Sequence, residues 1–167
     1  VAKAAIGYNI SFGSSYIVTP STPINFDTYL SPVSITGMQN NRLENADIKV
    51  LTTLQSSAVV PRAIPDASGN WMYSSIGDNS HQLGQLMAYY WINSEKLKAE
   101  SILKNSWHPT GKNVSVYSYC YDANGGGNGY NAYWAGQYSN YTCMSYLTPI
   151  ETAYDASVYL HEMGHAN

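Results

Sequence analysis

Hydrophobic residues recur at helical spacing between residues 80 and 103. They lie three or four positions apart, as on one face of an α-helix, and charged residues fall on the other face. The stripe consists of Leu83, Leu86, Met87, Tyr90, Ser94 and Leu97, and the opposite face carries Glu95, Lys96, Lys98 and Glu100. Asp78-Asn79-Ser80 supplies oxygens that can cap a helix start. The pattern therefore predicts a long helix from about Ser80 to Leu103.

The first 77 residues are strand-like and irregular, with clusters of Pro, Gly, Asn and Ser between short apolar segments. Such clusters separate β-strands. The segments expected to form strands are Ala4–Ile10, Ser15–Val18, Ile48–Leu54 and Trp71–Ser74. Residues 19–45 contain few periodic apolar positions, and we expect them to be mostly loop.

Strands are also expected between residues 113 and 147, where apolar and polar positions alternate. The first strand carries Val114, Val116, Ser118 and Cys120, and the next two span Tyr130–Ala135 and Tyr141–Leu147. Gly136–Asn140 is typical of a turn between the last two. We predict that these three strands form an antiparallel meander.

A second helix is predicted over residues 149–167. In Thr148-Pro149-Ile150-Glu151 the threonine can cap, the proline suits the first helical position, and the glutamate completes a capping box. The whole chain then reads as one α+β domain. Its mixed or antiparallel sheet is accompanied by one long helix and a C-terminal helix.

The C-terminal helix carries His161-Glu162-Met163-Gly164-His165. Residues four apart share a helix face, so His161 and His165 can reach one zinc ion, with Glu162 placed to take a proton from water. A catalytic zinc has three protein ligands, and this motif supplies two. The alternative is an unrelated pair of solvated or core histidines. Gly164 lowers helix propensity by about 1 kcal/mol relative to alanine, so we expect another group to pack closely against it.

Length and composition limit the classes of protein. A chain of 167 residues forms one domain with a real core. Charged residues make up 11%, aromatic residues 13%, and the net charge is −3. That charge offers no basic surface for nucleic acid and no polybasic patch for a membrane. No apolar run approaches the roughly 18–20 residues that span a bilayer.

Cys120 and Cys143 lie in strands expected to be neighbours. They form either a disulfide, if the protein resides in an oxidising compartment, or a pair of buried free thiols. We expect the disulfide and a secreted, extracellular protein.

With these elements in order, the chain resembles the N-terminal lobe of a thermolysin-like zinc metallopeptidase, a gluzincin. Gly129-Tyr130-Asn131-Ala132-Tyr133-Trp134 is similar to the family's Asn-Ala-Phe-Trp edge strand, which lies above the zinc cleft. The resemblance extends from about residue 71 to residue 167. It implies Zn²⁺ held by His161 and His165, with Glu162 as general base in peptide-bond hydrolysis. It also implies that Asn131, Ala132, Tyr133 and Trp134 contact an extended peptide substrate.

The family's third zinc ligand is a glutamate on a following helix, and this chain does not contain that region. The resemblance therefore implies a C-terminal lobe of the same enzyme as a partner and no activity without it. The two lobes could also be separate chains that reassociate after cleavage. The rival interpretation is a non-enzymatic module that binds a peptide or glycan, because sixteen tyrosines offer aromatic contact surface.

Overall fold

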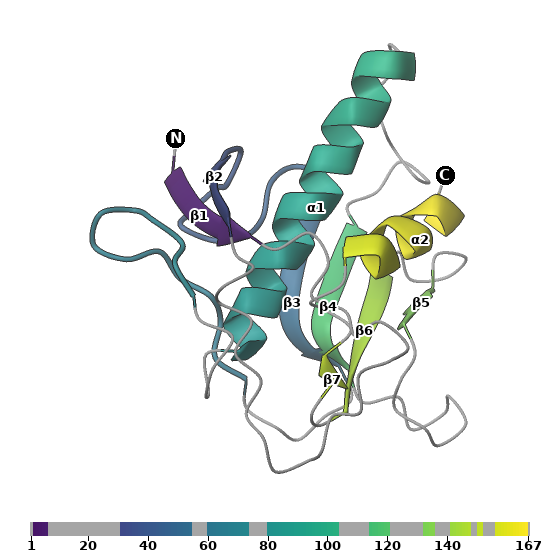
Figure 1. Cartoon of the computed structure of the whole chain (residues 1–167). Coiled ribbons are helices and arrows are strands. Elements are labelled where there is room, and N and C mark those ends of the chain that lie inside the picture. Colours follow the sequence, from purple (N-terminus) through teal and green to yellow (C-terminus); the bar gives the residue numbers. More distant parts are fainter. Residues whose placement is uncertain are drawn as a thin grey trace.

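Two helices pack on one face of a mixed β-sheet in the computed structural model, and a small second sheet lies beside the longer helix (Figure 1). The structure describes residues 2–6, 31–54, 60–73, 80–103, 114–120, 132–135, 141–147, 150–151 and 156–166. Within these ranges the protein is α+β, as the sequence predicts.

The larger sheet has the strand order β3-β4-β6-β5, and β7 pairs with the end of β6. Its strands are β3 (Ile48–Leu54), β4 (Val114–Cys120), β5 (Ala132–Trp134), β6 (Tyr141–Leu147) and β7 (Ile150–Glu151). The β3–β4 and β4–β6 pairs are parallel, whereas β5 and β7 run antiparallel to β6. The smaller sheet pairs β1 (Ala2–Ile6) with β2 (Ser31–Ile35) antiparallel.

The predicted antiparallel meander is wrong, because β4 pairs with β6 in parallel and β5 pairs with β6 alone among the described strands. The antiparallel pairing of β5 with β6 is confirmed, and the predicted turn Gly136–Asn140 lies outside the described residues. Alternation of apolar residues shows which face of a strand is buried but not which neighbour it pairs with. The bounds of β3, β4 and β6 agree with those predicted.

Helix α1 (Ser80–Leu103) spans the predicted residues, and it is the crossover that joins parallel strands β3 and β4. Its buried face is wider than the predicted stripe. Every residue from Gln82 to Tyr89 is buried, whereas Leu97 is 51% exposed. Lys96, expected on the outer face, is buried as well. Helical periodicity assumes one covered face, and the first half of α1 is covered on more than one side.

The additional cover comes from an extended segment that includes residues 60–66. The side chain of Gln85 accepts a hydrogen bond from Ala63 N and donates one to Pro61 O, both at 2.9 Å. Gln82 Nε2 donates to Arg62 O at 3.1 Å. Hydrogen bonding to this backbone permits polar side chains on α1 to be buried.

The second helix, α2, spans Ala156–Ala166, so it begins later than predicted. Ile150 and Glu151, read as its first turn, instead form β7 and pair with Leu147 and Tyr146. The capping motif describes only near neighbours in the sequence. Pairing with β6 gives the backbone N–H and C=O groups of these residues hydrogen-bond partners in the adjacent strand. Thr148 and Pro149 lie outside the described residues.

The N-terminal predictions are partly wrong. β1 begins at Ala2, earlier than predicted. The stretch expected to be mostly loop contains the strand β2, its residues 36–45 are turns and isolated bridges, and residues 19–30 lie outside the described part of the chain. Trp71 makes only a bridge, through Trp71 N to Lys3 O at 2.7 Å, and residues 72 and 73 are not strand. Residues 7–10 and 15–18 lie outside the described part of the chain.

One core connects these elements. It contains Ile35, Leu43, Ile48, Val50, Ala63, Trp71, Leu83, Leu86, Met87, Ala88, Tyr89, Ile92, Val114, Val116, Met144, Tyr159 and Met163. Residues from β3, β4, β6, α1 and α2 share this cluster, so both helices cover the same face of the sheet. Burial of this apolar surface is the main favourable term in folding.

We expect Gln85→Ala to lower the free energy of unfolding by about 2–3 kcal/mol, because it leaves a buried backbone donor and acceptor without partners. Lys98→Ala, at an exposed position of the same helix, should change it by less than about 0.5 kcal/mol. Urea denaturation measures both. Equal effects would contradict the role assigned to Gln85.

Candidate metal centre

Helix α2 buries one side and exposes the other. Tyr159 and Met163 are 0% and 1% exposed, whereas His161 and His165 are exposed. Residues four apart lie on one face, so these are two pairs on different faces. With about 100° between successive residues, the histidine pair points away from the core roughly opposite the Tyr159–Met163 pair.

A buried hydrogen bond joins α2 to α1. Tyr159 Oη donates to Gly84 O at 3.0 Å, within the buried contact between the two helices. A buried hydroxyl needs a partner, so the ring cannot turn away without a free-energy cost. This bond and the buried Met163 side chain hold α2 in the rotation that exposes the histidines. The sequence analysis did not identify Tyr159, although its spacing from Met163 is the available signal.

The two imidazoles face each other at the spacing of zinc ligands. His161 Nε2 and His165 Nε2 are 3.2 Å apart, with ring centroids at 4.8 Å and ring planes at 90°. Zinc–nitrogen bonds of about 2.0–2.1 Å in a tetrahedral arrangement separate two ligand nitrogens by about 3.3 Å. The spacing of the two nitrogens is thus close to that of two zinc ligands, and it is also that of a hydrogen bond between the rings. Both rings are exposed, which removes the core-histidine alternative.

Glu162 lies between the exposed and buried sides of α2. This residue is 6% exposed, which is unusual for a carboxylate. Helical geometry places Glu162 about 60° around the helix axis from both His165 and Tyr159. Its backbone position therefore lies at the margin of the histidine face, and its side chain is buried.

No third ligand accompanies the pair among the described residues, where no group of three His, Cys, Asp or Glu side chains is arranged to hold a metal. The structure thus brings together the two histidines and the glutamate that the sequence singled out.

Strand β5 lies at the edge of the larger sheet and contacts α2 (Figure 1). Ala135 N donates to Tyr141 O at 2.9 Å. Because the direction of the backbone N–H alternates along a strand, the N–H of Tyr133 also faces β6 and those of Ala132 and Trp134 face away. The edge next to the histidine helix therefore has backbone groups directed outward. Asn131 lies outside the described residues.

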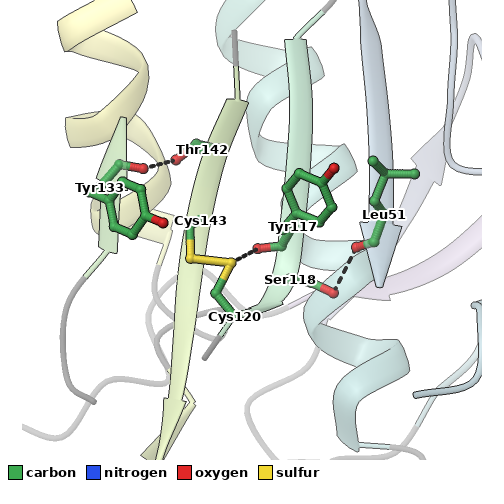
Figure 2. The surroundings of a disulfide bond; sticks show 7 residues. All are labelled: Leu51, Tyr117, Ser118, Cys120, Tyr133, Thr142 and Cys143. Atoms are coloured by element: carbon green, nitrogen blue, oxygen red, sulfur yellow. Dashed lines mark hydrogen bonds between the residues drawn. A yellow bond between two sulfur atoms is a disulfide. The ribbon is translucent and has the colours of Figure 1, made fainter. Parts of the chain in front are cut away.

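Tyr133 and Trp134 point to opposite faces, as strand alternation predicts. Tyr133 packs against the Tyr141 ring, with centroids 6.1 Å apart, and Trp134 is half-buried against the core. Thr142 Oγ1 donates to Tyr133 O at 3.1 Å, which adds a side-chain bond between β6 and β5 (Figure 2).

The two cysteines are joined in a disulfide between β4 and β6, with Cα atoms 5.7 Å apart (Figure 2). The register of the two strands shifts between Tyr117 and Cys120, so that Cys120 pairs with Ser145. Ser145 shares a face of β6 with Cys143, two residues away. Cys143 also pairs with Tyr133, and the cross-link is thus one strand from the sheet edge.

Gly164 is exposed, and a Cβ atom added there would meet no described atom within 4 Å. The predicted close packing against this glycine is wrong. The packed side of α2 carries Tyr159 and Met163, and Gly164 lies on the side of the histidines.

No helix among the described residues is long and apolar enough to cross a membrane. Comparison of the chain with family models, with curated proteins and with solved structures finds no match. The site is therefore interpreted from its own geometry.

Replacing either histidine with alanine should weaken zinc binding by at least about tenfold. Loss of a residue that only hydrogen-bonds to a zinc ligand already lowers metal affinity by about tenfold or more, and loss of a ligand should lower it further. Ser157→Ala, at an exposed position one turn earlier, should leave the affinity unchanged. Competition with a fluorescent zinc chelator measures this. Equal affinities for His165→Ala and the wild type would show that zinc binds elsewhere.

Proposed function

We propose that the chain is the N-terminal lobe of a thermolysin-like zinc metalloendopeptidase that hydrolyses peptide bonds. The 3.2 Å separation of His161 Nε2 and His165 Nε2, on a helix in contact with an open sheet edge, carries this proposal. A zinc pair beside such an edge combines a place for an extended peptide with a place for its scissile carbonyl.

His161 and His165 would hold the ion through Nε2. Zinc, when bound, supplies a Lewis acid that polarises a carbonyl oxygen and lowers the pKa of water. The four-residue spacing puts both rings on the same side of α2, and the burial of Tyr159 and Met163 turns that side away from the core. Preorganisation of this kind reduces the entropic cost of assembling a site.

Glu162 acts as the general base in this proposal. Its carboxylate accepts a proton from the attacking water and returns it to the leaving amine, while a hydroxyl group adds to the carbonyl carbon and the C–N bond breaks. Its position at the margin of the histidine face supports this assignment. The backbone of α2 holds it, so the transfer requires only rotation of the side chain.

The substrate would bind along β5 as an added strand. The outward N–H groups of Ala132 and Trp134 are free of β6 and suit the backbone of an extended peptide. Asn131 and Tyr133 complete the proposed substrate-binding segment. The sequence similarity of this segment to the family's edge strand supports the same placement.

The third zinc ligand and the transition-state donors would come from a C-terminal lobe, so we expect this chain to be inactive without it. Secretion to an oxidising, extracellular environment is also part of the proposal. The Cys120–Cys143 disulfide supports it, because such bonds persist mainly in oxidising compartments.

A second candidate is a non-catalytic module that binds a peptide or glycan. Its support is a group of half-buried tyrosines on the sheet. Tyr117 and Tyr133 both pack edge-to-face on Tyr141, with centroids at 5.6 Å and 6.1 Å. Aromatic faces suit such ligands. This candidate leaves the histidine geometry without a role, and we therefore favour the peptidase.

In the enzyme assembled with its second lobe, Glu162→Gln should lower kcat by about 10²–10⁴-fold, because the amide cannot accept the water proton. Zinc content should not change. Glu95→Gln on α1 is the matched control and should retain full activity. Turnover of a fluorogenic peptide and metal analysis measure the two effects, and an active Glu162→Gln enzyme would remove Glu162 from the mechanism.

Proline at two adjacent edge positions tests the direction of the backbone groups. Ala132→Pro deletes an outward N–H and should reduce kcat/KM about 5- to 10-fold, the value of one hydrogen bond, with little change in stability. Tyr133→Pro deletes an inward N–H and should destabilise the β5–β6 pair. Peptidase kinetics and thermal unfolding distinguish them. If Ala132→Pro keeps full kcat/KM, peptides do not bind along β5.

A further inference from the structure

The outward face of α2 is the exposed side that carries the proposed zinc ligands. It carries Ser157, His161, Gly164 and His165, all exposed. The two imidazoles fit adjacent corners of a tetrahedral zinc, as their 3.2 Å separation shows. Two corners then remain for groups from elsewhere, since the described part of the chain offers no third ligand.

A second copy of the chain carries the same pair. Two copies related by a twofold axis through the metal would present four imidazoles, which is a complete zinc coordination shell. We propose that zinc joins two copies of this chain, each contributing His161 and His165. This inference rests on the zinc site of the proposed function and not on peptidase activity.

The shape of the face permits this approach. An added Cβ at Gly164 would meet no described atom within 4 Å, and Ser157 one turn earlier is also small. A second helix can therefore come close to the imidazoles without displacing a side chain. Like charge does not oppose the contact, because the exposed α2 residues other than the histidines are uncharged and Glu162 is buried.

The proposed enzyme would be inactive in this zinc-joined form. A zinc ion with four imidazole ligands has no open position for substrate, whereas a catalytic zinc keeps one. A C-terminal lobe that supplies the third ligand would compete with the second copy for the same face.

The test is a zinc titration of the untagged chain followed by sedimentation velocity, because a polyhistidine tag would add ligands. The 18.4 kDa species should double in mass as zinc reaches half an equivalent per chain. Excess zinc should reverse the change, since each pair then binds its own ion, and a chelator should reverse it at any ratio. His165→Ala should stay monomeric throughout.

Gly164→Trp fills the bare surface and should raise the dimer dissociation constant at least tenfold. Ser101→Trp places the same ring at an exposed site on α1 and should not. A wild-type chain that binds zinc at half an equivalent per chain with unchanged mass would overturn the inference but leave the metal site standing. A chain that binds no zinc would overturn both. A dimer that survives in His165→Ala, or is unaffected by Gly164→Trp, would place the contact elsewhere and overturn the inference.

Discussion

The contact between α2 and α1 is the constraint on which the site depends. Tyr159 and Met163 are almost completely buried, and the Tyr159 hydroxyl donates to the carbonyl of Gly84 at 3.0 Å. Rotation of α2 about its axis would expose these side chains and leave the hydroxyl without its partner. The direction of His161 and His165 therefore follows from residues that contact no metal.

A disulfide constrains the sheet beside β5, the strand proposed to bind substrate. The disulfide holds Cys143 in β6 to the end of β4, and β5 is the next strand outward. Thr142 adds a bond from β6 to the carbonyl of Tyr133. The sheet edge and α2 thus pack on the same core and also contact each other, which fixes the position of β5 beside the histidine helix.

Two histidines fill only two of the four ligand positions of a zinc ion, so both proposals take the remaining ligands from elsewhere. In one, a second lobe completes a catalytic zinc that keeps an open position. In the other, a second copy completes a closed zinc without one. Both proposals use the same exposed face, and under them the identity of the partner would decide whether a bound zinc is reactive or structural.

The sequence by itself determined what depends on local spacing: the bounds of α1, β3, β4 and β6, and the alignment of His161 with His165 on one helical face. Hydrogen bonds within a helix and alternation along a strand are set by near neighbours. Only the tertiary structure decided the parallel pairing of β4 with β6, the late start of α2 at Ala156 and the bare surface at Gly164. Each depends on which distant segment lies alongside, and local periodicity carries no information about that partner.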